Sequence, residues 1–433
     1  MRPPSSPRRF PHRVAGAVLA LGIGFAWGFV TERRKTFPFS LLKRIAAETG
    51  FPRSSPLPEP AREQFSRLQS LPYISGSYDP AHERRGVLLY EPEKCQDGYN
   101  LYSSGLGHCS ALIDMKGHVL WRWCAEQALG PGAIDPKGWI NPLFSAGGTF
   151  LLNVQDRGIF RIDEFSRASW KFDAPSHHDV YAAASGEVVA PEHRRRPGSP
   201  AYEGEILDDG VLVLDADGKL REEISLYDLF LDSPYAFLLP RTRLAEYRGK
   251  DGVEPFHLNH VEVLDGSLSS LSPLYRAGNL LISLRHLSCV AIVDSRNRKI
   301  LWAWGPGNVV FQHDPTMLPN GDVLIFDNGL KSSQVVEVDP RTDRVVWSYA
   351  PHDGFFSPQL GAAQRLENGN TLVTESDRGY AFEVSPAGEV VWRFANPEVD
   401  ASGFRSGILR MTRYGAARLP FLRARLPDAT RVR

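Results

Sequence analysis

The sequence predicts an all-β fold, a six-bladed β-propeller that follows an N-terminal membrane helix. Trp302, Trp347 and Trp392 recur at equal steps of 45 residues, and a fixed period in this range is typical of a repeat architecture. Within each period, apolar runs such as 322–326 and 370–373 are bounded by clusters of Gly, Asn, Asp and Pro. Apolar runs separated by turn residues in this way indicate about four short strands per period, which is one propeller blade.

A second pattern sets the number of blades. A pattern of an apolar residue and an Asp, followed by an apolar strand that ends in Trp, occurs at 113–121, 162–170, 293–302 and 338–347. Two related copies depart from it at one position each: 214–224 ends in Ile224, and 384–392 has Ser385 in place of the Asp. Six copies indicate six blades, so we expect a propeller over residues 81–420 and a tail over 421–433. The gap between the third and fourth copies is long enough to contain a degenerate blade, which leaves seven blades as the alternative.

Residues 1–35 carry the pattern of a membrane-targeting segment. Arginines without acids precede the uncharged stretch 14–30, and a charged cluster closes it at 31–35. Its 17 residues are at the short end of what spans a bilayer, and 26–28 is a poor cleavage site. We therefore expect an uncleaved transmembrane signal anchor; a cleaved signal peptide and an apolar segment that packs elsewhere are the alternatives. Residues 36–80 are interpreted as a juxtamembrane amphipathic helix and a Pro-rich linker.

The composition excludes some classes of function. The 50 basic and 50 acidic residues cancel, whereas a general nucleic-acid binder needs a net positive surface. The four cysteines contain no C-x-x-C pair, which argues against a zinc site of the finger type. Cys95 and Cys109 flank a short Gly-rich segment and are the candidate disulfide of an exported protein. Buried free thiols are an equal alternative.

Histidines recur at one position of the predicted blades, the start of the innermost strand. His178 and His313 each stand eight residues before the Gly of a turn, and His257 stands nine residues before one. Innermost strands line the central channel, so these side chains are expected to converge on one axis. A lone histidine is more often structural, but three at equivalent positions indicate a shared functional site. Arg285, which follows an apolar strand, adds a cation.

The chemistry of this set favours an anionic ligand over a metal. Arginine binds oxyanions through paired N–H groups and repels cations, and the sequence shows no carboxylate or thiolate that converges with the histidines. We therefore expect neither a resident metal nor a cofactor. A three-histidine zinc site is the alternative.

At these residues the sequence resembles the arylsulfotransferase family. The motifs that carry the resemblance are H-x-N at 257–259, S-x-R-H at 283–286, Q-H-D…L-P-N-G…F-D-N-G at 312–329, S-P-Q-x-G-A-A-Q-R-L-x-N-G-N-T-L at 357–372 and a closing ILRMTRY at 408–414. The resemblance covers about residues 86–415. It implies an exported six-bladed propeller that moves a sulfuryl group from an aryl sulfate to a phenol through a transiently sulfated histidine.

The resemblance also implies roles for individual residues. His313 matches the histidine that becomes sulfated. The matches to the residues that assist it are His257, Arg285 and His178, with His177 adjoining the last, and the residues of the same motifs expected to bind substrate are Asn259 and His286. The chemistry is sound on general grounds, because an imidazole is a good neutral nucleophile and an arginine stabilises charge on sulfuryl oxygens.

One departure from the family lies at the N-terminus. Its best-known bacterial members dimerise through an N-terminal β-sandwich, and residues 1–85 are too short and too polar for one. The oligomeric state and the identity of donor and acceptor therefore stay open.

Two functions from different classes follow. The first is a membrane-anchored arylsulfotransferase-like enzyme whose propeller is periplasmic or extracellular. The second is a non-catalytic propeller that binds a ligand or a protein partner, since a fold does not give a function. A complete set of His and Arg at channel-facing positions favours the enzyme, because a binding platform does not need it. A quinone-dependent dehydrogenase is a third hypothesis, weakened by the lack of a recognisable calcium-binding acid cluster.

Overall fold

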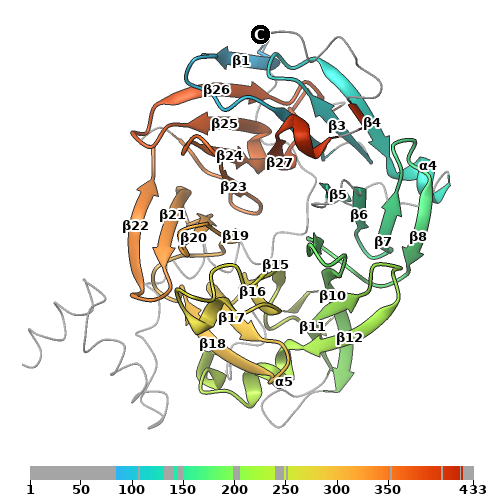
Figure 1. The fold of residues 1–433 in the computed structure, drawn as a ribbon, viewed down its shortest axis with the longest axis vertical. Coiled ribbons are helices and arrows are strands. Elements are labelled where there is room, and N and C mark those ends of the chain that lie inside the picture. Colours follow the sequence, from blue (N-terminus) through green and yellow to red (C-terminus); the bar gives the residue numbers. More distant parts are fainter. Residues whose placement is uncertain are drawn as a thin grey trace, which may run out of the picture. The chain divides into compact units, whose positions relative to one another are not determined.

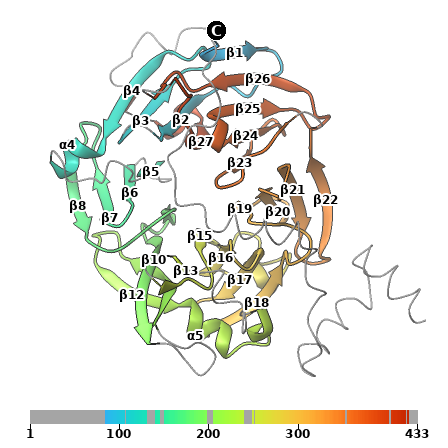
Figure 2. The same ribbon diagram turned by 180° about the vertical axis from the view of Figure 1, so that it is seen from behind.

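The computed structural model describes residues 84–105, 108–130, 140–144, 150–197, 205–238, 248–249, 252–351, 354–400, 403–419 and 421–422. Their strands form six antiparallel blades around a ring, seen from its two faces in Figures 1 and 2. The predicted six-bladed propeller is confirmed, and the described residues contain no seventh sheet.

In the first three blades, the first strand named is at the centre of the ring and the fourth is at its rim (Figure 1). Blade 1 consists of β27 (Ile408–Tyr414), β2 (Tyr99–Ser104), β3 (Cys109–Ile113) and β4 (Val119–Cys124). Blade 2 consists of β5 (Ile140–Phe144), β6 (Phe150–Val154), β7 (Gly158–Ile162) and β8 (Ala168–Phe172). Blade 3 consists of β9 (Tyr181–Ala182), β10 (Val188–Pro197), β11 (Glu205–Leu214) and β12 (Leu220–Ser225), with the short strands β13 (Arg248–Gly249) and β14 (Gly252–Val253) beside β11.

The other three blades follow the same order. Blade 4 consists of β15 (Leu258–Val263), β16 (Asn279–Leu284), β17 (Cys289–Asp294) and β18 (Lys299–Trp304). Blade 5 consists of β19 (His313–Met317), β20 (Val323–Asp327), β21 (Gln334–Asp339) and β22 (Arg344–Tyr349). Blade 6 consists of β23 (Ala362–Arg365), β24 (Thr371–Glu375), β25 (Tyr380–Val384) and β26 (Val390–Ala395), and β1 (Gly86–Tyr90) is added outside β26.

Two pairings join the ends of the described chain and close the ring. β27 pairs with β2, where Tyr414 lies opposite Tyr99, and β1 pairs with β26 of the last blade. The expectation that 408–414 pairs with the first blade is therefore confirmed. A buried ion pair between Arg413 of β27 and Glu383 of β25 connects the closing strand with blade 6. Without β27, the inner edge of β2 would stay open, and an open strand edge is a site of aggregation.

The repeated Trp and Asp have separate structural roles. The Trp lies on the fourth strand of its blade. Its indole N–H donates to a turn of the next blade, from Trp121 to Glu164 O (2.7 Å), from Trp302 to Asp343 Oδ1 (2.8 Å) and from Trp392 to Met115 O (2.9 Å). The Asp closes the turn before that strand; Asp114 Oδ1, for example, accepts the N–H groups of Lys116 and His118. This is the turn geometry that Asp side chains favour.

The core lies between neighbouring blades. Middle strands are packed on both faces, so all five residues of β20 and of β24 are buried. Rim strands have one face in solvent, and β22 is accordingly exposed at most of its positions. Continuous apolar runs in the sequence therefore mark the middle strands, as expected for strands buried on both sides.

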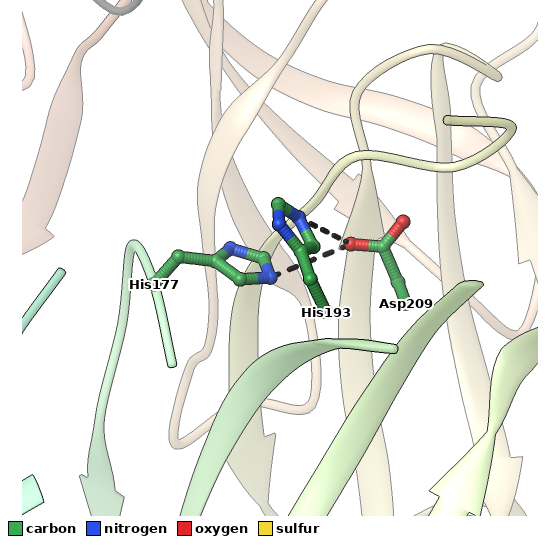
Figure 3. Close-up of side chains that lie close together, drawn as sticks. All are labelled: His177, His193 and Asp209. Carbon is green, nitrogen blue, oxygen red and sulfur yellow. Dashed lines mark ion pairs between the residues drawn. The ribbon is translucent and has the colours of Figure 1, made fainter. Parts of the chain in front are cut away.

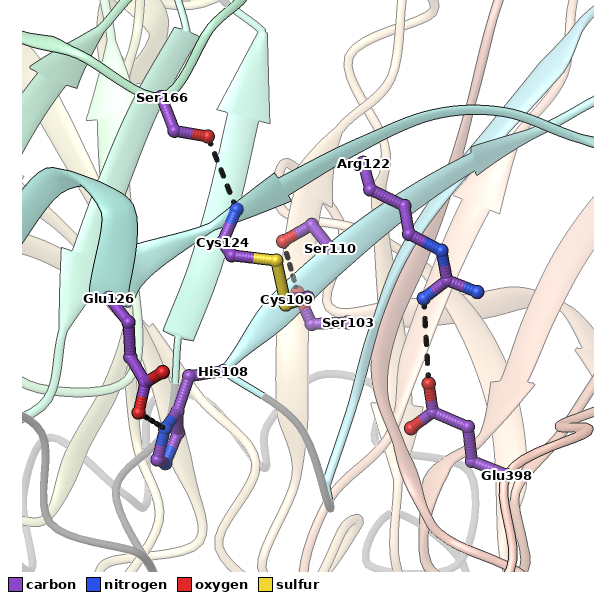
Figure 4. The surroundings of a disulfide bond; sticks show 9 residues. All are labelled: Ser103, His108, Cys109, Ser110, Arg122, Cys124, Glu126, Ser166 and Glu398. Atoms are coloured by element: carbon purple, nitrogen blue, oxygen red, sulfur yellow. Dashed lines mark hydrogen bonds and ion pairs between the residues drawn. A yellow bond between two sulfur atoms is a disulfide. The ribbon is translucent and has the colours of Figure 1, made fainter. Parts of the chain in front are cut away.

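The disulfide differs from the predicted one. Cys109 bonds to Cys124 (Figure 4). Cys95 is a free thiol. Cys109 and Cys124 are directly opposed in the register of β3 and β4, with Cα atoms 4.0 Å apart. Cys95 instead precedes β2 and points its Sγ at Val391 O of blade 6, 3.3 Å away. The Cys95–Cys109 pairing was wrong because strand register, not closeness in sequence, decides which thiols meet.

Helices are few and short in the described residues. They are α4 (Ala125–Leu129), α5 (Leu226–Leu231) and the 3-10 turns Ala236–Leu238, Pro273–Tyr275, Ser376–Arg378 and Ala416–Arg418. No helix among the described residues is long and apolar enough to cross a membrane. The predicted signal anchor at 14–30 and the juxtamembrane segment at 36–80 lie outside those residues.

Candidate functional site

All six blades contribute to one pocket at the inner strands. Its volume is about 400 Å³ including its opening to solvent, and its lining residues are Asn141, His178, Asn259, His313, Asp314, Leu360, Gly361, Leu409 and Arg410. Three of the predicted site residues line it directly, namely His178, Asn259 and His313. The other three, His257, Arg285 and His286, are buried next to this set.

His313, the first residue of β19, has one nitrogen fixed and the other left for chemistry. Its Nδ1 lies 2.9 Å from Phe311 O and 2.7 Å from Asn328 Oδ1. Both atoms are acceptors, so Nδ1 carries the proton and donates it. Nε2 then keeps its lone pair, and this buried atom has no hydrogen-bond partner among the described residues. The side chain therefore presents one oriented, nucleophilic nitrogen.

Asn328 makes this orientation unambiguous. Its Nδ2 donates to Ser357 O (2.6 Å) and Leu360 O (2.9 Å), so its Oδ1 must face His313. Asn328 is fully buried at the end of β20. Asn328 belongs to the F-D-N-G motif, where its role was not predicted; a polar residue next to a buried strand within a motif is the signal that could have found it.

Hydrogen bonds join three of the five motifs, those at 257–259, 283–286 and 312–329. The Gln312 side chain donates to Ser283 Oγ at 2.9 Å and to the main-chain oxygens of Leu284 and Cys289. Asn259 Nδ2 donates to Gln312 O at 2.9 Å. Gln312, the residue before His313, therefore connects blade 5 with blade 4. These bonds hold the backbone on which His313 lies.

His178 and His257 occupy the same backbone conformation at the start of their blades. Both have φ of 55°, a left-handed value that is uncommon for residues other than glycine. Their rings meet at 4.8 Å between centroids, and the ring of His286 lies 4.6 Å from that of His257. Strained backbone of this kind concentrates at functional sites, where surrounding structure holds it. The prediction that these histidines converge is confirmed.

Arg285 lies in the turn between β16 and β17. Its guanidinium carbon is 4.5 Å from the centre of the Phe311 ring, and the backbone N–H of Arg285 donates to His257 O at 3.0 Å. Only 5% of the residue is exposed. Burial is the largest cause that lowers the pKa of His313, and the charge of Arg285 is the second. Burial and His257 lower the pKa of His286, Glu254 raises it, and Arg285 lowers it further. The charge of Arg285 therefore acts on the interior of the site.

Carboxylates also converge here, which corrects the prediction of a cluster without them. Glu254 Oε1 lies 2.9 Å from His257 Nδ1 and 3.3 Å from His193 Nε2. Asp209 is fully buried and accepts the backbone N–H of His257 at 3.0 Å. Both acids come from segments whose sequence shows no periodic relation to the histidines, so no pattern pointed to them.

On the side of the pocket formed by blade 1, Arg410 is the centre of a network of ion pairs. Its guanidinium bonds to Asp179 Oδ1 at 2.9 Å and to Asp314 Oδ1 at 2.8 Å, while His260 Nδ1 lies 2.8 Å from Asp179 Oδ2. Burial raises the pKa of Asp179, but Arg410 and His260 outweigh it and hold that pKa below its usual range. Arg410 belongs to the closing motif ILRMTRY, and its place in the pocket was not predicted.

The burial of His313 makes the stability of the fold depend on pH. Burial, followed by the charge of Arg285, lowers the pKa of His313 to about 3, although the bonds to Asn328 and Phe311 act to raise it. In an unfolded chain this pKa is about 6.5. Below that pH the unfolded state binds a proton that the folded state does not, so this contribution lowers stability as the pH falls from about 6.5 toward 3.

We expect His313→Asn to lose this part of the pH dependence. Between about pH 7.5 and about pH 5, the wild type should lose about 2 kcal/mol more stability than the variant, since pH 5 is about 1.5 units below the unfolded pKa. Urea unfolding of both proteins at both pH values measures the difference. Equal losses in the two proteins would show that His313 takes up its proton while folded.

Comparison with known proteins agrees with these motifs. A family model described as Arylsulfotransferase (ASST) matches residues 147–397, more than half of the chain and most of blades 2 to 6. No curated protein matches the chain.

Several solved structures are similar to this chain at low sequence identity. A crystal structure of a protein of unknown function from Bacteroides caccae is 14% identical, covering 73% of this chain and 99% of that one with a TM-score of 0.49. A streptogramin B lyase structure is 9% identical, with coverages of 78% and 97% and a TM-score of 0.43. A catalytically inactive virginiamycin B lyase from Staphylococcus aureus, solved with quinupristin, is 11% identical, with coverages of 64% and 84% and a TM-score of 0.38. At these scores the likenesses carry no inference about function.

Proposed function

Because the chain belongs to the arylsulfotransferase family, we propose that its pocket transfers a sulfuryl group from an aryl sulfate to a phenol, with His313 carrying the group between them. The observation that carries this proposal is the state of His313. Its Nδ1–H is held by two acceptors, and its Nε2, beside the pocket, has no hydrogen-bond partner in the part of the chain that the structure describes.

In the first step, His313 Nε2 attacks the sulfur of the donor. The N–S bond forms as the bond between sulfur and the aryl oxygen breaks, and the electron pair leaves with the phenolate, which then takes a proton. The sulfated ring becomes an imidazolium, whose positive charge is stabilised by the bonds from Nδ1–H to Asn328 and Phe311. The low pKa of His313 keeps the attacking nitrogen unprotonated at neutral pH.

In the second step, the oxygen of an acceptor phenol attacks the same sulfur. The acceptor gives its proton to a base, the N–S bond breaks, and its electron pair returns to Nε2. Splitting the transfer in this way replaces one difficult displacement by two easier ones.

The neighbouring residues have matching roles in this scheme. Arg285 stabilises the negative charge that builds on the sulfuryl oxygens, in a site where burial strengthens that interaction. His257, whose ring is positioned by Glu254, is the proposed acid in the first step and base in the second. His178 and Asn259 line the pocket and are proposed to orient the substrate.

The direct test is incubation of the protein with a chromogenic aryl sulfate and no acceptor. We expect a burst of phenol equal to the enzyme concentration, and a mass increase of one sulfuryl group on the peptide that contains His313. A later addition of phenol should remove the group and produce an aryl sulfate. If the protein binds the aryl sulfate without a burst or turnover, it is a binding platform instead.

The N-terminal segment bears on where in the cell the protein acts. We propose that residues 14–30 anchor the protein in a membrane, with the propeller outside the cytoplasm. Protein extracted from membranes should then retain its N-terminus, which N-terminal sequencing measures. A mature chain that starts beyond about residue 28 would identify a cleaved signal peptide instead.

A further inference from the structure

A second group of histidines lies in blade 3, beside the pocket but outside its lining. His177 precedes β9, His193 is in β10 and Asp209 is in β11, and their side chains point at one another (Figure 3). Asp209 Oδ1 lies 3.5 Å from His177 Nε2 and 3.4 Å from His193 Nε2. The sulfuryl-transfer scheme uses none of these three residues directly.

The two ring nitrogens that face Asp209 are buried, and His193 Nε2 also lies 3.3 Å from Glu254 Oε1. Nε2 of His177 and Nε2 of His193 are both shielded from solvent, and neither has a hydrogen-bond partner among the described residues. His177 is 1% exposed and Asp209 is fully buried. The two imidazole rings lie 3.7 Å apart between centroids, so positive charge on both would be strongly unfavourable.

We propose that His177, His193 and Asp209 bind a divalent transition metal ion of the Zn²⁺ type. Two imidazole nitrogens and a carboxylate oxygen are a ligand set that Zn²⁺ takes in proteins. Zinc bonds of about 2.0–2.1 Å at tetrahedral angles place neighbouring ligand atoms about 3.3–3.4 Å apart. The separations of 3.4 and 3.5 Å on either side of Asp209 Oδ1 are close to that spacing.

The site has the outer contacts that orient metal ligands. His177 Nδ1 lies 2.8 Å from His178 Nδ1, and Asp209 accepts the N–H groups of His257 (3.0 Å) and Leu258 (3.1 Å). With the metal on His177 Nε2, Nδ1 carries the proton and donates it to His178. A metal here therefore sets the hydrogen bonding of His178 and holds the backbone of His257, so it acts as a positioning element for the pocket.

The other candidate group, Glu254, His257 and His286, is less suited to a metal. His257 Nδ1 and Glu254 Oε1 are already paired at 2.9 Å, and His286 Nδ1 lies 2.9 Å from Glu254 O. Arg285, adjacent to His286 in sequence, adds a positive charge that opposes a second cation there.

The test uses the full chain, stripped of metal with a chelator and titrated with Co²⁺, which reports tetrahedral coordination through its visible absorption bands. We expect one tightly bound Co²⁺ per chain, displaced by one equivalent of Zn²⁺. His193→Ala should abolish both the absorption and the stoichiometric binding. His177→Ala is the second variant, should the first fail to fold, and is expected to give the same loss.

Three control variants locate the metal. His118→Ala removes an exposed histidine that pairs with Asp114, and it should bind Co²⁺ like the wild type. His286→Ala, from the other candidate group, should retain the metal, and so should His313→Asn, which makes the result independent of sulfuryl transfer. Absence of stoichiometric binding in the wild type, or unchanged binding in both His193→Ala and His177→Ala, would overturn the proposal.

Thermal unfolding provides a readout separate from the spectrum. A ligand that binds only the folded state raises its stability, by about 2.7 kcal/mol at a free concentration 100 times Kd. Zn²⁺ should therefore raise the Tm of the stripped wild type and leave that of His193→Ala unchanged. An equal rise in both proteins would place the bound metal elsewhere.

Discussion

The His313→Asn variant is expected to release no phenol from an aryl sulfate, either in a burst or in steady turnover. Asparagine retains a polar side chain of modest size but has no nitrogen lone pair that can attack sulfur. The covalent route then has no first step, so both half-reactions stop together. Stopped-flow absorbance with the donor alone measures the burst, and intact-protein mass measures whether the enzyme becomes sulfated.

Two controls separate loss of chemistry from loss of structure. The circular dichroism and the cooperative unfolding of His313→Asn at neutral pH should remain those of a folded propeller, because the core lies between the blades rather than at this pocket. His118→Asn makes the same substitution at an exposed histidine and should retain full activity. If His313→Asn kept normal turnover, His313 could not carry the sulfuryl group.

The Arg285→Ala variant should have the next largest effect, slowing sulfation by about 10²–10³-fold. The guanidinium is buried, and its charge reaches His313, where the sulfuryl group is transferred. Its loss removes stabilisation of the charge that develops on the sulfuryl oxygens, which lowers the rate of bond making more than it lowers donor affinity. The rate and the amplitude of the burst, measured over a range of donor concentrations, distinguish the two effects.

The Arg285→Lys variant separates the effect of charge from that of geometry, since it keeps the positive charge and removes the planar pair of N–H donors. Its burst should be faster than that of Arg285→Ala, because the charge is kept. It should be slower than that of the wild type, because a lysine cannot make paired bonds to two sulfuryl oxygens. Arg298→Ala removes an exposed arginine that pairs with Glu222, and should leave the burst unchanged. Normal burst rates in Arg285→Ala would remove Arg285 from the reaction.

The sequence predicted those parts of the fold and site that repeat. The Trp period of 45 residues exists because each indole reaches the next blade, so the period counts blades. His178 and His313 were predictable for the same reason, because equivalent positions in a propeller face one axis and both line the pocket.

Features that depend on one pairing between distant segments were not predictable. Cys124 meets Cys109 only through the register of β3 and β4. Glu254 and Asp209 reach the histidines from segments without a repeated position, so the sequence argument against carboxylates failed. Arg410 enters the pocket from a strand that blade 1 takes from the far end of the chain.

The closure between β27 and β2 determines when the protein becomes complete during its synthesis. A nascent chain emerges from its N-terminus, so blade 1 holds three strands and an open edge at β2 until the strand that begins at Ile408 arrives. Contacts as distant in sequence as Tyr99 with Tyr414 form late, because a long loop must close first. Until then the pocket lacks Arg410. A chain released before Ile408 therefore has five complete blades, an edge at β2 that is open to aggregation and a pocket without Arg410, so the complete pocket forms only after β27 has been made.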